Sequence, residues 1–222
     1  LLKPGYVEEW WHLELEKADA EIAANTNSRR VSLEQAGEYS RRFGIPLHPK
    51  YIYYWKEVLR ESFLNLLEWL TRSHIVSGKL ILPFAISDRE IFAEAKRALE
   101  LMGVEHEVTI EHVVFSLEES SALLANLGID FHREGTLRQP ADLLLEQFQK
   151  HEGDVLSFLN TVSGFIIKDK AGTYIGARMG RPEKAKARKL IGSPHVIFPV
   201  GEEGGRLRSM QAAVEVGTVV AE

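Results

Sequence analysis

Hydrophobic residues in the first part of the chain recur at the spacing of helices. Between residues 7 and 25, Trp10, Leu13, Leu15 and Ile22 are mixed with charged residues in a loose helical pattern. This pattern predicts that the first third of the chain is mainly helical.

Three further helices are expected to begin at a serine that is followed three residues later by Gln or Glu, the sequence of a capping box. The pairs are Ser32–Gln35, Ser87–Glu90 and Ser116–Glu119. Each helix is followed by a glycine suited to end it, namely Gly44, Gly103 and Gly128. A β-rich stretch at residues 107–115 separates the last two helices. Residues 86–129 are therefore predicted to form a small helix–strand–helix unit.

Two prolines interrupt the helical pattern after the first of these helices. Pro46 and Pro49 forbid a regular helix, so residues 44–49 are predicted to form a turn or an extended linker. The aromatic and aliphatic residues 51–70 predict a largely buried helical element. Residues 75–83 are expected to form a strand or a connector.

The sequence becomes β-rich toward its end. Pro140 and Asp154 mark the starts of two more helices. Residues 165–168 and 173–175 are β runs joined by a short loop that contains glycine, which is the pattern of a hairpin. Further short strands are expected at residues 195–200 and 217–220.

Together these elements predict an α+β fold in three regions. A helical region covers residues 1–75, a mixed helix–strand accessory region covers residues 76–150, and a β-rich segment covers residues 151–222. No internal repeat is present, which argues against a solenoid.

Composition narrows the class of protein. The chain of 222 residues has a net charge of −5 and no cysteine, which excludes disulfides and thiolate metal sites within it. The eight histidines show no zinc-type spacing, so no zinc site is expected. No apolar run is long enough to cross a bilayer. A cytoplasmic protein without membrane contact is the expectation.

Basic residues are concentrated in one strip, which we define as residues 176–189. Between residues 178 and 189, six basic residues and one acid give a local charge of +5, which leaves −10 for the rest of the chain. The basic residues are Arg178, Arg181, Lys184, Lys186, Arg188 and Lys189. Gly176 and Gly180 would let backbone N–H groups approach a phosphate closely. The strip therefore predicts a contact with nucleotide or nucleic-acid phosphates, although a solvated charged turn would have the same composition.

The strip lies within a longer motif. Residues 168–186 read Lys-Asp-Lys-Ala-Gly-Thr-Tyr-Ile-Gly-Ala-Arg-Met-Gly-Arg-Pro-Glu-Lys-Ala-Lys, and this stretch resembles a motif in the large, catalytic subunit of archaeal family D DNA polymerase. Residues 44–51 (Gly-Ile-Pro-Leu-His-Pro-Lys-Tyr) and 195–201 (His-Val-Ile-Phe-Pro-Val-Gly) are similar to other segments of that subunit, in the same order.

The resemblance implies a two-barrel catalytic core like that of multisubunit RNA polymerases. One double-psi β-barrel provides basic residues and the other provides metal-binding aspartates. The β-rich segment here would form part of the basic barrel. Lys186 and Lys189 are then the candidate catalytic residues, contacting an incoming triphosphate or the primer end. Arg178, Arg181, Lys184 and Arg188 are the candidate DNA- or nucleotide-binding residues.

His48 and Lys50 are further candidates for a DNA contact, since they lie together in the proline-bounded loop. A packed loop histidine is the alternative for His48. The neighbouring Tyr51, Tyr53, Tyr54 and Trp55 would form either a base-stacking platform or part of the core.

The resemblance also implies what the chain lacks. Two Mg²⁺ ions in such a core need clustered carboxylates, and the six aspartates include no Asp-x-Asp pair. The Mg²⁺ is therefore expected to be bound by carboxylates outside this chain. The chain is expected to be an internal fragment of the large subunit that does not polymerise DNA alone.

The function expected for the full subunit is that of a replicative DNA-directed DNA polymerase, a nucleotidyltransferase. Its implied partners are a DNA primer-template, dNTPs, the remainder of the large subunit and the small exonuclease subunit, with a sliding clamp as a further candidate. Two alternatives stay open: a non-catalytic nucleic-acid-binding module, and a subunit-docking module in which the strip is incidental.

Overall fold

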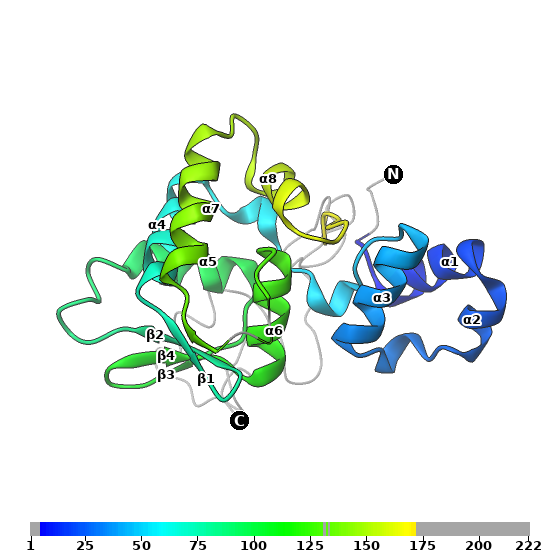
Figure 1. Ribbon diagram of the computed structural model, residues 1–222, viewed down its shortest axis with the longest axis horizontal. Helices are drawn as coiled ribbons and strands as arrows, with labels where there is room; N and C mark the ends of the chain where they lie inside the picture. The colour runs from blue at the N-terminus through cyan, green and yellow to red at the C-terminus, as the bar shows by residue number, and fades with distance from the viewer. Residues whose placement is uncertain (1–4, 131, 133, 172–222) are drawn as a thin grey trace, which may run out of the picture. The chain divides into compact units, whose positions relative to one another are not determined.

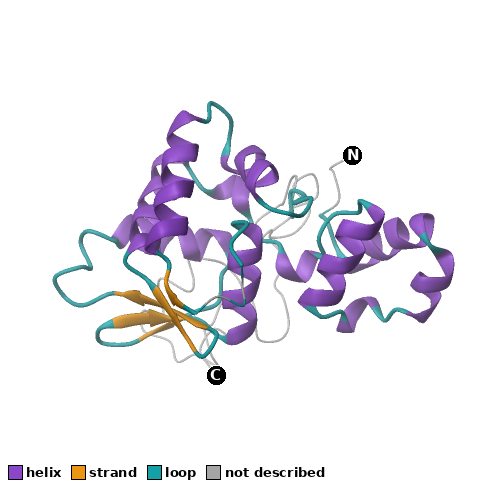
Figure 2. Cartoon of the chain, viewed as in Figure 1, coloured by secondary structure: helices purple, strands orange, loops and turns teal. Residues whose placement is uncertain are grey.

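The structure is a computed structural model that describes residues 5–130, 132 and 134–171. It is an α+β structure in which helices predominate and the strands form one small sheet (Figures 1 and 2). The α-helices are α1 (Glu8–Ala18), α2 (Ala20–Asn25), α3 (Leu33–Phe43), α4 (Arg60–Thr71), α5 (Ala93–Met102), α6 (Leu117–Asn126), α7 (Arg138–Lys150) and α8 (Val155–Val162). Short 3₁₀ helices are η1 (Ser28–Arg30), η2 (Pro49–Tyr51) and η3 (Trp55–Glu57).

The first three helices form where the sequence predicts helical structure. Asp19 separates α1 from α2, and its carboxylate accepts a hydrogen bond from the Ile22 backbone N–H at 3.0 Å. Ser32 and Gln35 form both halves of the predicted capping box at the start of α3. Gly44 follows α3 with φ of 65°, a left-handed conformation that glycine adopts without strain.

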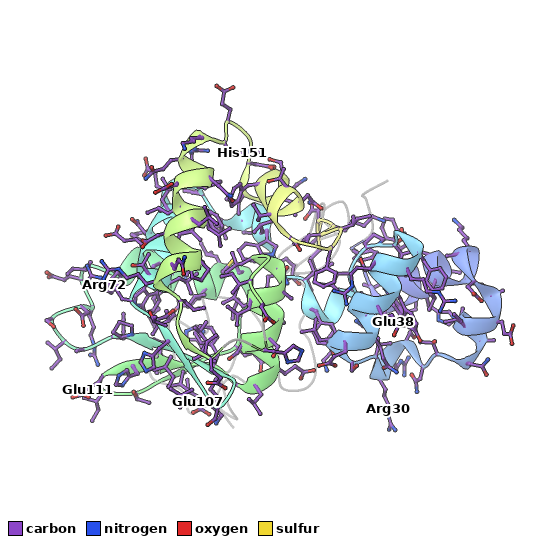
Figure 3. All side chains as sticks on the ribbon, viewed as in Figure 1. Arg30, Glu38, Arg72, Glu107, Glu111 and His151 are labelled. Carbon is purple, nitrogen blue, oxygen red and sulfur yellow. The ribbon has the colours of Figure 1, made fainter. Side chains whose placement is uncertain are left out.

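The sheet is antiparallel and has the order β3-β4-β2-β1-β5. Its strands are β1 (His74–Val76), β2 (Lys79–Pro83), β3 (Glu107–Val108), β4 (His112–Val114) and β5 (Gly135–Thr136). Ile75, Leu80, Leu82 and Val113 are fully buried and point to the face that packs on α4 and α6. Charged side chains such as Arg30 and Glu111 extend outward from the ribbon (Figure 3).

Helix α4 lies at the centre of the helical layer and packs along α7 and α5 (Figure 1). Phe63 of α4 meets Phe148 of α7 edge-to-face at a centroid distance of 4.7 Å, and Phe158 of α8 meets Phe148 at 4.9 Å. Such edge-to-face pairs add to the free energy of burial, and they join three helices in one aromatic cluster.

The helix predicted across residues 51–70 begins only at Arg60, so this prediction was wrong for its first part. Residues 52–59 form no regular secondary structure apart from η3. Side-chain bonds hold this backbone, because Tyr53 and Trp55 both hydrogen-bond to residues of α6. The physical reason is a tertiary contact. The Tyr53 hydroxyl and the Trp55 indole N–H are buried and need hydrogen-bond partners, which α6 provides only when this stretch is not a continuous helix.

Two other predicted helix starts are displaced. The capping box expected at Ser87–Glu90 does not form; residues 88–92 are turns and α5 begins at Ala93 without a side-chain cap. Pro140 lies at the third position of α7 and not at the first. The Ser116 and Asp154 caps form as predicted, because each accepts a hydrogen bond from the backbone N–H three residues later.

The described residues belong to one compact unit, residues 1–173, and the β1–β2 hairpin spans the predicted boundary at residue 75. The proposed strands at residues 173–175, 195–200 and 217–220 lie outside the described residues. Of the predicted first hairpin strand, Ile166 forms an isolated parallel bridge with Pro46.

The segment Ile45–Trp55, which we call the buried segment, runs through the core without regular secondary structure beyond η2 and the start of η3. Asn126 of α6 is fully buried and bonds to this segment at two of its residues. Its amide nitrogen donates to the Tyr51 carbonyl at 2.7 Å, and its amide oxygen accepts from Trp55 Nε1 at 2.9 Å. A buried backbone carbonyl without a partner would be costly, so Asn126 makes this path possible.

Replacing Asn126 by leucine should lower the free energy of unfolding by about 2–4 kcal/mol, because two buried polar groups would lose their partners. The Asn25→Leu variant is the control, since Asn25 is exposed at the end of α2 and should change stability by less than about 0.5 kcal/mol. Denaturant unfolding followed by circular dichroism measures both. Equal losses in the two variants would contradict this account.

Candidate nucleic-acid interface

The basic residues predicted from the strip lie outside the described residues. These are Arg178, Arg181, Lys184, Lys186, Arg188 and Lys189. The structure does describe the beginning of the motif that contains them, residues 168–171, together with the preceding residues 165–167. We call residues 165–170 the root segment, because the strip follows it closely in the chain.

The root segment lies beside the buried segment. The Leu47 N–H donates to the Ile166 carbonyl at 2.8 Å, and Pro46 and Ile166 form a parallel bridge. Lys170 Nζ donates to the Ile52 carbonyl at 2.9 Å. The buried segment and the root segment, which lie more than 100 residues apart in the sequence, therefore meet in the fold.

Lys168 is held by the amino-terminal helix. Its ammonium pairs with the Glu14 carboxylate and lies 4.4 Å from the Trp10 ring centroid and 4.8 Å from that of Tyr6. The Tyr6 hydroxyl donates to the other Glu14 oxygen at 3.2 Å, and burial raises the pKa of Tyr6 far above its ordinary value. A cation between two aromatic faces and a carboxylate is well stabilised. The charge of Lys168 is therefore used in contacts inside the protein.

Lys170 also points inward. Besides its bond to Ile52, its ammonium lies 5.3 Å from the Tyr54 ring centroid. Burial lowers the pKa of Lys170, and the nearby Glu119 carboxylate acts in the opposite direction. The Lys170 carbonyl accepts from the Tyr6 N–H at 2.9 Å, and the intervening Asp169 pairs with Lys56 at 3.2 Å.

His48, predicted from sequence as a DNA contact, is buried with 1% exposure. Its Nε2 lies 2.8 Å from the Ser28 carbonyl, which can only accept, and its Nδ1 accepts from the Lys50 N–H at 3.2 Å. These partners select the neutral ring with the proton on Nε2. Its ring also packs edge-to-face on Trp11 at 4.7 Å. A DNA contact would require this loop to open, and it stays a prediction.

Lys50 remains at the surface. Its ammonium pairs with the Glu118 carboxylate of α6, and the two side chains are 46% and 55% exposed. The hydrogen bond that Lys50 donates to this carboxylate raises the pKa of Lys50. An exposed pair contributes little to stability, so Lys50 could exchange Glu118 for a phosphate at small cost.

The aromatic residues after Lys50 belong mostly to the core. Tyr51, Tyr53 and Trp55 are each at most 3% exposed, which leaves only Tyr54 with a partly accessible ring. The Tyr53 hydroxyl donates to the Glu119 carboxylate at 2.6 Å. Burial raises the pKa of both groups, so Tyr53 remains a neutral donor. Buried rings of this kind cannot stack on bases.

Among the residues that the structure describes, no three His, Asp or Glu side chains cluster as they would around a metal ion. In the same residues, no helix combines the length and the apolar character needed to cross a membrane.

Sequence reasoning missed the internal roles of Lys168 and Lys170, and the role of Glu14 as the partner of Lys168. The two lysines stand at alternate positions at the end of the predicted β run and just after it, on the same side as the exposed Ile166, so the alternation does not predict their burial. Their partners, Glu14 and the Ile52 carbonyl, lie far away in the sequence, and no local pattern indicates them.

Comparison with known proteins gives a consistent result. The family model described as the central domain of the DNA polymerase II large subunit DP2 matches residues 1–221. The chain is 34% identical over 219 residues to the DNA polymerase II large subunit of Archaeoglobus fulgidus, covering 96% of this chain and 17% of that protein. It is 38% identical over 186 residues to the corresponding subunit of Methanopyrus kandleri, covering 83% of this chain and 15% of that protein. The identity to the corresponding subunit of Methanothermobacter thermautotrophicus is 34% over 232 residues, covering 100% of this chain and 19% of that protein.

The chain thus spans less than a fifth of the length of each of these relatives. The matched region includes both the described residues and the strip.

The buried ring of His48 should make stability depend on pH. Burial lowers its folded pKa below 6.5, so as pH falls through that value the unfolded chain binds a proton that the folded chain does not. The charges of Lys50 and Lys170 lower this pKa further, while Glu8 opposes them. Stability attributable to His48 is therefore complete above about pH 6.5 and is lost on acidification, by at most about 1.4 kcal/mol per pH unit.

The His48→Gln variant, which can still donate to Ser28, should lack this part of the loss. The measurement is the free energy of unfolding of both proteins at pH 8 and at pH 5.5. Parallel losses would show that the His48 ring does not resist protonation.

Proposed function

The chain belongs to the family of the DNA polymerase II large subunit DP2, as its central domain, and from this we propose that it is part of a DNA-directed DNA polymerase. The reaction would be template-directed transfer of nucleotides from dNTPs to a primer, in DNA replication. The observation that supports the proposal most directly is the match over residues 1–221 with relatives of that name, since it covers the strip as well as its root segment.

The strip would supply positive charge to phosphates in this reaction. Lys186 and Lys189 are the proposed contacts to the incoming triphosphate or primer end. Lysine is a compact point charge, and charge that builds on transferring phosphoryl oxygens is stabilised by preorganised cations. The arginines of the strip offer planar forks that bind phosphate oxygens in pairs and suit a grip on the strand backbone.

The charge distribution and the root segment support a fixed position for the strip. Its local charge of +5 stands on a chain whose remainder sums to −10, which would focus the attraction of a polyanion on one surface. The two lysines directly before it, Lys168 and Lys170, are used in internal contacts. The basic residues of the motif would therefore have two roles: Lys168 and Lys170 anchor the chain, and the residues of the strip are the proposed phosphate contacts.

We further propose that the chain after α8, within residues 151–222, forms part of a double-psi β-barrel in an RNA-polymerase-like two-barrel core. The described residues offer no carboxylate cluster suited to Mg²⁺. Because the sequence contains no Asp-x-Asp pair, we propose that the metal-binding carboxylates belong to another part of the polymerase and that residues of this chain bind and orient phosphates. The proposed partners are primer-template DNA, dNTPs, the remainder of the large subunit, the small exonuclease subunit and a sliding clamp.

Removing the charge of Lys186 and Lys189 tests the role of the strip. In the full polymerase, the double variant Lys186→Met/Lys189→Met should lower the rate constant of nucleotide addition by about a hundredfold or more, with DNA affinity changed less than about threefold. The control, Lys17→Met/Lys150→Met, removes the same charge from exposed positions on α1 and α7 and should leave the rate unchanged.

Rapid-quench measurement of single-nucleotide addition, together with DNA titration at several salt concentrations, separates the outcomes. If affinity falls together with the rate and the salt slope drops by about 1–2, the strip grips the backbone and is not catalytic. If neither changes, the strip has no role in synthesis.

The 222-residue chain alone should not extend a primer in the presence of dNTPs and Mg²⁺, because the proposed metal-binding carboxylates lie elsewhere. A primer-extension assay with the full polymerase as positive control tests this. Extension by the purified chain would show that the carboxylates are present within it.

A further inference from the structure

The root segment is held at every one of its residues by a different part of the described chain. Phe165 lies beneath the Arg41 guanidinium at 5.3 Å, Ile166 bonds to Leu47, and Lys168 pairs with Glu14. Asp169 pairs with Lys56 of η3, and Lys170 donates to the Ile52 carbonyl, which precedes η3. A segment that served only as a linker between two elements would not need a contact at every residue.

Ile167 is held in an unusual way. The Asn160 side chain of α8 accepts from the Ile167 N–H and donates to the Ile167 carbonyl, both at 2.9 Å. The amide thus takes the place of a neighbouring strand and satisfies both polar groups of one extended residue. The side chain of Ile167 is 3% exposed, so the residue is fixed on both sides.

Asn160 is not needed for the helix in which it lies. Helix α8 begins at the Asp154 cap and packs through Phe158 and Leu159, which are buried. Asn160 itself is exposed, and its remaining bond is to the Leu156 carbonyl one turn earlier. Because Asn160 lies outside the packed face of α8, loss of its amide should change global stability less than loss of a core side chain would.

We propose that Asn160 is a positioning residue for nucleotide addition, which fixes the backbone at Ile167 and so sets where the strip meets its phosphates. This inference rests on the proposed function of the strip. Eight residues lie between Ile167 and Gly176, where the strip begins, so Asn160 is one of the contacts that fix the chain shortly before the strip. Displacement of a catalytic group by about 1 Å is enough to slow a reaction strongly.

The test uses the full polymerase with Asn160→Ala. The rate constant for single-nucleotide addition should fall about tenfold, while the Kd for primer-template stays within about twofold and the Tm within about 2 °C. Hydrogen exchange in peptides that cover residues 164–170 should be faster, because the Ile167 N–H loses its acceptor. Asn160→Asp, which keeps the acceptor and loses the donor, should give intermediate values of rate and exchange.

Asn25→Ala is the matched control. Asn25 is also an exposed asparagine whose amide donates to the carbonyl four residues earlier, Glu21 at 2.9 Å, but it does not contact the root segment. It should leave the rate constant, the Kd and the exchange of residues 164–170 unchanged.

The proposal is overturned if Asn160→Ala leaves the rate unchanged, if the rate falls without faster exchange, or if the rate falls only together with Tm. Failure of the proposed function is distinguishable, because the Lys186→Met/Lys189→Met variant would then retain full synthesis. In that case the exchange measurement still shows whether Asn160 holds Ile167, and a positioning role in catalysis is excluded.

Discussion

The constraint on which the rest of the structure depends is the buried segment, Ile45–Trp55. A chain that passes through a core without regular helix or sheet must still find partners for its backbone N–H and C=O groups. The Ser40 hydroxyl donates to the Ile45 carbonyl at 2.7 Å, and the Tyr54 N–H donates to the Met102 carbonyl at 3.1 Å. With Asn126, these partners come from three helices, so the buried segment fixes α3, α5 and α6 to one another.

The same constraint connects the root segment to the core. The Ile52 carbonyl has the Lys170 ammonium as its partner, and the Leu47 N–H has the Ile166 carbonyl. The Lys170 ammonium thus satisfies a carbonyl of the buried segment, and the same hydrogen bond anchors the start of the motif. Partial burial of a lysine is tolerable here because its ammonium donates to a carbonyl and lies near an aromatic face and Glu119.

This arrangement gives the basic residues of the motif two different roles. Lys168 is neutralised by Glu14 and held between aromatic rings, while Lys170 replaces a missing backbone partner. Positive charge alone would have grouped these lysines with the proposed phosphate contacts of the strip. Their environments separate them, since groups engaged in internal pairs are not available to a ligand. A similar distinction applies in the loop, where His48 is enclosed and Lys50 stays exposed.

The sequence by itself determined the features that depend on neighbouring residues. The caps at Ser32, Ser116 and Asp154 and the left-handed Gly44 follow from bonds within four residues, which the sequence specifies directly. It also supplied the family and the division of charge between the strip and the rest of the chain. The double-psi barrel and the roles of the strip residues stay predictions, because the residues concerned lie outside the described part.

Only the tertiary structure decided the path of residues 51–59, the late start of α5 and the inward direction of Lys168 and Lys170. These features depend on partners far away in the chain, such as Glu14 for Lys168 and Asn126 for Tyr51. Local helical preference favoured a continuous helix after Tyr51. It was overridden because buried polar groups had to meet those distant partners, and no local pattern encodes such a requirement.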